Sequence, residues 1–248
     1  MNLPTDPLFY VVATLAIVLV GLAKGGFAGL GAASIPMLAL VMDPIRAAAM
    51  LLPILMVQDV VSVWAFRKSY DRTTLGWMVP GAMLGIGLGW WFAASVSADA
   101  IRAAVGVIAV GFGGYRLSGY KPSTGIILPH WIGSYWGSVA GFTSQIAHAG
   151  GPPFQVWAMS RGFSHTVFIG TSAIFFAVIN WLKVPAYFAL GQFTWNNMQL
   201  TLIFLPIAII STLAGVVMVK RIDPARFFGI ISWLMVAVGV TLLYATAT

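Results

Sequence analysis

Few side chains in this sequence could take part in chemistry. Two of them, Gln58 and Asp59, stand in the middle of the apolar run 45–66, where a polar side chain is most unfavourable. If that run crosses a bilayer, a central Asp costs about 3 kcal/mol to insert and is a functional candidate by default. An acid would repel an anion directly. Its expected role is therefore coupling to H⁺ or Na⁺, or pairing with Lys24 or His148.

A glycine-rich segment in the middle of the chain, 141–153, holds a second group of polar residues. Thr143 and Ser144 could donate hydroxyls to an oxyanion, or bond their own backbone. Gln145 and His148 are three residues apart and would share one face of a helical turn. A His here can donate to an oxyanion and changes charge near neutral pH. The alternative is a neutral imidazole bonded to a backbone carbonyl that the break leaves free.

Three more polar residues flank or interrupt apolar runs: Lys24, Arg161 and Asn180. Lys24 precedes the first glycine-rich segment and could neutralise an anion, or could reach the interface with its long side chain. Arg161 could hold an anion through two hydrogen bonds, or anchor a cytoplasmic loop. Asn180 lies in the apolar run 164–190 and is the candidate neutral counterpart of Asp59.

Each glycine-rich segment, 25–36 and 141–153, leads into an apolar run too short to cross a bilayer alone. Both segments begin with Gly-Phe and end in proline, which predicts two re-entering half-helices. The N-terminus of a half-helix offers free N–H groups and partial positive charge, which suit an anion. The candidate anion site is accordingly Gly26, Gly29, Gly31 and Ser34 from the first segment, and Thr143, Ser144, Gln145, His148 and Gly151 from the second, with Lys24 and Arg161. For other glycines, helix packing is the favoured role; these are Gly85, Gly87, Gly89, Gly111, Gly113 and Gly114.

The composition sets the class of protein that must position these residues. Of the 248 residues, 60% are hydrophobic and only 8% are charged, and the mean hydropathy is +0.93. A soluble domain carries about 25% charged residues. We therefore expect an all-α polytopic membrane protein in the lipid bilayer, with no separate soluble domain.

Several function classes are excluded by what the sequence lacks. There is no cysteine, so thiolate metal sites are ruled out, and the basic residues stand singly, which argues against nucleic-acid binding. No phosphate loop, His-Glu-x-x-His or Gly-x-Ser-x-Gly motif is present. An aspartyl protease needs two membrane carboxylates, and only Asp59 qualifies. We expect no enzyme activity, no metal and no cofactor.

Matched positions indicate an internal duplication. Pro80 corresponds to Pro206, and Gly89 to Gly215, each nine residues after its proline. Asp99-Ala-Ile-Arg102 likewise corresponds to Asp223-Pro-Ala-Arg226, and each Asp is expected to start a helix, as is Asp43 before Pro44. We expect two repeats, 1–120 and 121–248, in one membrane domain, each a broken-helix hairpin plus three transmembrane helices.

Loop charges distinguish two topologies. If each broken segment crosses the membrane once, each side receives six basic residues, against the positive-inside rule. If each is a hairpin, one side receives nine and the other only Arg46, Arg102 and Lys183. The hairpin arrangement obeys the rule and inverts the two repeats, an architecture that recurs in secondary transporters. Both termini would then lie on the periplasmic side of a bacterial inner membrane.

The duplicated chain, with Gly25-Gly26-Phe27-Ala28-Gly29-Leu30-Gly31 leading to Pro36, resembles the TauE/SafE family of membrane proteins over nearly its whole length. The second segment departs from the family pattern, since Thr143-Ser144-Gln145 and His148 stand where glycine is commoner. The resemblance implies transport of a small sulfur-containing anion such as sulfite, sulfoacetate or another organosulfonate. Together with the inverted hairpins it predicts a secondary transporter working by alternating access. An anion channel or facilitator of the same architecture is the alternative, and the oligomeric state stays open.

Overall fold

The computed structural model describes residues 4–27, 29–119, 129–219, 221 and 225–247, and of 225–228 only the backbone. All regular structure within these residues is helical, as predicted. The first half of the chain forms α1 (Pro7–Lys24), the 3-10 helix η1 (Leu30–Ala33), α2 (Ser34–Leu38), α3 (Pro44–Phe66), α4 (Arg72–Ser95) and α5 (Ala98–Leu117). The second half forms α6 (Trp131–Ala147), α7 (Gly151–Ser160), α8 (His165–Ala189), α9 (Trp195–Met218) and α10 (Ala225–Ala247).

Seven helices among the described residues are long and apolar enough to cross a membrane: α1, α3, α4, α5, α8, α9 and most of α10. The protein is therefore a multi-pass membrane protein. The helix α6 has 17 residues and includes 141–147 of the second glycine-rich segment. The shorter helices α2 and α7 begin inside the two glycine-rich segments. The expected half-helices thus begin at Ser34 and Gly151.

Side-chain caps fix where several helices begin. The Asp43 side chain accepts from the backbone N–H of Arg46 at 2.9 Å, so the predicted start of α3 at Asp43-Pro44 is confirmed. The cap of α5 is Ser97, and Asp99 lies in the first turn of that helix, where it pairs with Arg102 at 2.8 Å. Asp223 lies outside the described residues.

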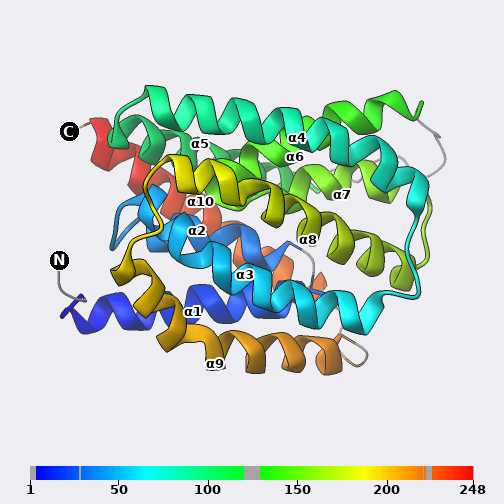
Figure 1. The fold of residues 1–248 in the computed structure, drawn as a ribbon, viewed down its shortest axis with the longest axis horizontal. Helices are drawn as coiled ribbons and strands as arrows, with labels where there is room; N and C mark the ends of the chain where they lie inside the picture. Colours follow the sequence, from blue (N-terminus) through cyan, green and yellow to red (C-terminus); the bar gives the residue numbers. More distant parts are fainter. Residues whose placement is uncertain (1–3, 28, 120–128, 220, 222–224, 248) are drawn as a thin grey trace.

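Helices from the two halves of the chain pack on each other in matching pairs. Helix α1 packs on α9 and α6 on α4, while α3 packs on α8 and α5 on α10. In Figure 1 the long helices run along the same axis, and the N- and C-termini lie at the same end of the molecule. The connections α3–α4 and α7–α8 lie together at the opposite end (Figure 1).

Glycines make the closest of these helix contacts. A Cβ on Gly85 would lie 2.0 Å from the Ser138 carbonyl oxygen of α6, and one on Gly215 would lie 2.9 Å from Cα of Gly25. The predicted packing role is confirmed for Gly85, Gly89 and Gly113, where an added Cβ would lie within 3 Å of an atom of a neighbouring helix. The predicted packing role is wrong for Gly87, Gly111 and Gly114, where an added Cβ would have no atom of the described residues within 4 Å.

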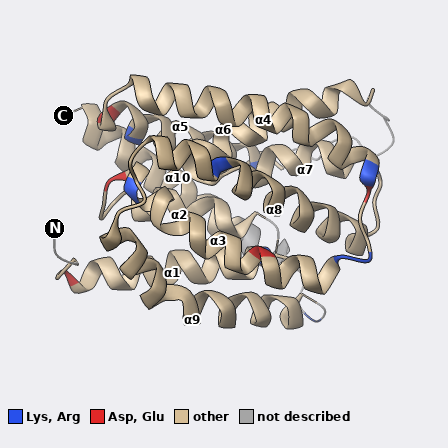
Figure 2. Ribbon diagram, in the orientation of Figure 1, with Lys and Arg blue, Asp and Glu red and all other residues tan. Residues whose placement is uncertain are grey.

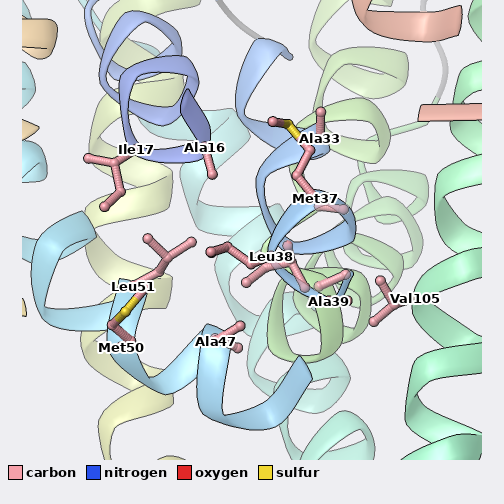
Figure 3. Packing of buried hydrophobic residues seen from close by; sticks show 14 of the residues in the cluster. Ala16, Ile17, Ala33, Met37, Leu38, Ala39, Ala47, Met50, Leu51 and Val105 are labelled. Atoms are coloured by element: carbon pink, nitrogen blue, oxygen red, sulfur yellow. The ribbon is translucent and has the colours of Figure 1, made fainter. Parts of the chain in front are cut away.

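Small and branched side chains hold the first half-helix between the long helices. Helix α2 is buried along its length, and residues of η1 and α2 pack against α1, α3 and α5. Figure 3 shows this packing around Ala16, Ile17, Ala33, Met37, Leu38, Ala39, Ala47, Met50, Leu51 and Val105. The break after α1 is therefore enclosed by protein, which is the condition for irregular backbone inside a bilayer.

Charged residues gather at the two ends of the helices and are rare between them (Figure 2). One of the exceptions corrects the loop-charge argument. Lys183, counted there as a loop residue, lies inside α8 with no exposed surface, because α8 extends to Ala189. The hairpin arrangement loses one basic residue from its less basic side, so the asymmetry of its loops increases.

Candidate functional site

The two glycine-rich segments meet at one cavity of about 80 Å³. A water molecule needs about 10–15 Å³ of such space, so the cavity is large enough for a small ion or several waters. The two segments come close together here, since a Cβ added to Gly151 would lie 3.9 Å from Cα of Gly29. Predicted site residues that line the cavity are Lys24, Gly26, Gly29, Gly31, Ser144, His148, Gly151 and Asn180.

The first segment needs glycine for its backbone conformation. Gly26 has φ 127° and Gly29 has φ 96°, which residues with a Cβ rarely adopt. Gly31 packs against α1, where a Cβ would meet that of Ala23 at 3.3 Å. These conformations let the chain leave α1 after Lys24 and turn back into η1 within the protein.

The second segment turns at His148, which ends α6 in the left-handed conformation with φ 47°. Helix α7 begins at Gly151, but Pro152 and Pro153 follow and carry no N–H group. The expected row of free amides at this half-helix is therefore reduced. Helix α2 has only five residues, and its dipole is correspondingly small. Positive charge at the cavity comes mainly from side chains.

Lys24, Asp59 and Asn180 form one buried cluster beside the cavity. The Lys24 ammonium pairs with the Asp59 carboxylate, and the two side chains are 11% and 3% exposed. Asn180 Nδ2 donates to the other carboxylate oxygen of Asp59 at 2.6 Å. Lys24 also lies 5.3 Å from the ring centre of Phe176. Lys24 therefore does not extend to the membrane interface, because its partner lies in the protein interior.

A second cluster contains Lys183, which the sequence argument missed. Its ammonium lies 2.7 Å from His148 Nδ1 and donates to Ser144 Oγ at 3.1 Å. His148 Nε2 lies 2.9 Å from the carbonyl oxygen of Ala48. His148 therefore bonds a backbone carbonyl, but this carbonyl belongs to α3 and not, as one of its two expected roles had it, to the break. The sequence signal for a buried lysine is the position of Lys183 inside the apolar run 164–190, whereas the loop-charge count places Lys183 in a loop.

The remaining predicted site residues do not line the cavity. The hydroxyl groups of Ser34 and Thr143 donate to backbone carbonyls, Ala16 at 3.0 Å and Val139 at 2.8 Å. Gln58 donates to the Ala208 carbonyl of α9 at 3.3 Å. Gln145 borders a separate, smaller void. Arg161 caps the end of α7, with its guanidinium 5.3 Å from the ring centre of Trp157.

Gln155 and Arg116 add a polar group that the sequence argument also missed. Gln155 lines the cavity from α7, and its Oε1 accepts from the Arg116 guanidinium of α5. The guanidinium packs on Gly29, where an added Cβ would lie 2.7 Å from Nη2. The lining of the cavity therefore includes polar groups from α1, α6, α7 and α8, together with the rings of Phe154 and Phe176.

Comparison with known proteins identifies the family to which the chain belongs. The family model described as "Sulfite exporter TauE/SafE" matches residues 13–242, which is nearly the whole chain. No curated protein and no solved structure matches. The match covers both glycine-rich segments and every residue of the two clusters, and it confirms the resemblance seen in the sequence. The chain therefore belongs to the TauE/SafE sulfite exporter family, a family of membrane transporters rather than enzymes.

Proposed function

We propose that this protein is a secondary transporter that carries a small sulfur-containing anion, such as sulfite, sulfoacetate or another organosulfonate, by alternating access. The observation that carries the proposal is a cavity lined by both helix breaks, whose polar lining includes a lysine, an amide and a hydroxyl. Broken helices that meet in the protein interior are the usual sites of secondary transporters. The family supports a sulfur-containing anion as substrate.

Donors around the cavity suit the oxygens of a sulfite or sulfonate group. Lys24 supplies a cation, Asn180 a side-chain amide and Ser144 a hydroxyl, and all three line the same space. Gln155 lines the same cavity, and its carbonyl oxygen already accepts from Arg116, which leaves its NH₂ group to donate. The anion would exchange its hydration for these fixed donors.

The arrangement of the helices supports two inverted repeats, 1–120 and 121–248. The pairing of α1 with α9 is matched by that of α6 with α4, as a two-fold relation between the halves requires. Asp59 and Asn180, which bond each other, lie equally far from the starts of α3 and α8. Alternating access would then rock one repeat against the other. With the basic loops inside, the termini lie in the periplasm of a bacterial inner membrane.

Coupling is assigned to Asp59. A bound anion competes with the Asp59 carboxylate for Lys24, and a carboxylate that loses its cation takes up a proton more readily. In the structure each oxygen of the Asp59 carboxylate already accepts from a donor, one from Lys24 and the other from Asn180. We therefore propose that H⁺ is the coupling ion.

Reconstituted liposomes test the proposal. The protein should take up labelled sulfite or a labelled sulfonate, and excess unlabelled substrate inside should drive counterflow, which a channel does not support. Ser144→Ala should raise KM because it removes a donor at the cavity. Ser34→Ala is the matched control, since Ser34 lies in the other segment and bonds Ala16 away from the cavity. Equal effects of the two variants, or flux without counterflow, would contradict the proposal.

A further inference from the structure

Lys183 is a fully buried lysine, and the bonding partners that the structure describes for it are all neutral. Its side chain has no exposed surface, and its ammonium contacts His148 Nδ1 at 2.7 Å, Ser144 Oγ at 3.1 Å and the Ser144 carbonyl at 3.4 Å. Among the described residues, no carboxylate lies within 4 Å of it. A buried charge normally has a partner of opposite sign, because its desolvation is otherwise uncompensated.

The contacts of His148 fix which groups donate. The Ala48 carbonyl can only accept, so His148 Nε2 carries the hydrogen and Nδ1 of the neutral ring accepts from Lys183. Ser144 Oγ also accepts from Lys183, and among the described residues nothing takes the hydroxyl hydrogen of Ser144. That hydrogen remains to donate to a ligand in the cavity, which Ser144 and His148 both line.

The other charges near the cavity leave the charge of Lys183 uncompensated. Lys24 and Asp59 neutralise each other as an ion pair. Arg116, which donates to Gln155, adds a further positive charge near the cavity. A negative ligand in the cavity would therefore compensate Lys183 through one layer of side chains.

We propose that Lys183 is a positioning residue that makes this cavity select ligands by negative charge. It holds His148 and Ser144 in place, and its charge is compensated by the bound anion acting through the Ser144 hydroxyl. The ligands selected are tetrahedral or pyramidal sulfur oxyanions and not their neutral analogues of equal size. This inference rests on the proposed function, because it concerns the same cavity.

The test compares binding of methanesulfonate with that of methanesulfonamide, a neutral analogue of similar shape. For the purified wild-type protein in detergent, methanesulfonate should bind at least tenfold more tightly. Lys183→Met removes the charge and the hydrogen bonds, and Lys183→Gln removes the charge while keeping a donor for His148. Both should clearly lower the ratio of the two affinities, with Lys24 as the cation that remains at the cavity. Lys68→Met is the control, since Lys68 is exposed in the α3–α4 connection and should leave the ratio unchanged.

Each outcome assigns the failure to one proposal. A wild-type protein that does not prefer methanesulfonate contradicts the anion site itself. A wild-type preference that survives undiminished in both neutral variants overturns only the role of Lys183. Because both variants relieve the burial of a charge, each should keep a ligand-free melting temperature near that of the wild type. Failure of both to fold would show that Lys183 is needed for the structure, and would overturn the proposal too.

Discussion

The Asp59 carboxylate accepts from two donors, Lys24 and Asn180, and an asparagine at this position could still accept from one of them. Asp59→Asn keeps the size of the side chain and a carbonyl oxygen that can accept from Lys24 or Asn180, but it cannot release or bind a proton near neutral pH. We expect this variant to retain substrate exchange between equal pools and to lose accumulation driven by a pH gradient. Both are measured with labelled substrate in liposomes.

Asp99 provides the control for that experiment. It is an exposed acid at the start of α5, paired with Arg102, so Asp99→Asn should leave pH-driven accumulation intact. If Asp59→Asn still accumulated substrate in response to a pH gradient, Asp59 would not be the coupling residue.

His148 gives a second prediction at the scale of a residue, because its backbone is left-handed. That conformation costs most residues about 1–2 kcal/mol and is worst for β-branched ones. His148→Gly and His148→Val both remove the ring and its bonds. We expect the Gly variant to be the more stable of the two in thermal unfolding, although it buries less apolar surface.

The order should reverse at an ordinary helical position. Val60 lies in the interior of α3 and is 69% exposed, so Val60→Gly should lower the melting temperature relative to the wild type. A Val variant at position 148 as stable as the Gly variant would show that the turn between α6 and α7 does not require the left-handed conformation.

At the scale of the element, two glycines of α4 have opposite surroundings. Gly85 faces α6, where a Cβ would meet the Ser138 carbonyl oxygen at 2.0 Å, whereas Gly87 has nothing within 4 Å. Gly85→Ala should therefore destabilise the protein by about 1–3 kcal/mol through overpacking. Gly87→Ala should be neutral or up to about 1 kcal/mol stabilising, because Ala favours the helix. Thermal unfolding of both variants checks this, and equal melting temperatures would contradict the α4–α6 contact.

The same two glycines show how far the sequence could predict the elements. Apolar runs placed the long helices, and the two glycine-rich segments placed the breaks, since each signal is local. Which glycines pack depends on spacing: Gly81, Gly85 and Gly89 are four apart and share a face of α4, whereas Gly87 lies off that face. Grouping glycines without regard to this period led to the wrong assignment of Gly87.

The site was less predictable, because its groups come from distant parts of the chain. Asp59 and Asn180 stand out as polar residues in apolar runs, and Lys24 stands out because it precedes the first glycine-rich segment. Their contacts depend on how α1, α3 and α8 pack. Lys183 was misplaced for a physical reason. A lysine usually marks a helix end, and only the packing of α8 against the second break shows it to be buried.

For the whole molecule, the path of the chain through the membrane is testable, because the protein contains no cysteine. Single cysteines at exposed positions can therefore be labelled without further changes. Lys68 lies in the α3–α4 connection, His165 begins α8, and Ala98 begins α5. Figure 1 places the α3–α4 and α7–α8 connections at one end of the molecule and the chain termini at the other.

We expect a membrane-impermeant maleimide added to intact cells to label Ala98→Cys and to spare Lys68→Cys and His165→Cys until the membrane is opened. Hairpins return to their starting side, so 68 and 165 share the basic cytoplasmic face. If each broken segment crossed the membrane once, 165 would instead be labelled together with 98. That result would mean that each broken segment crosses the membrane once. The two repeats would then not be inverted, and the proposed transporter architecture would be wrong.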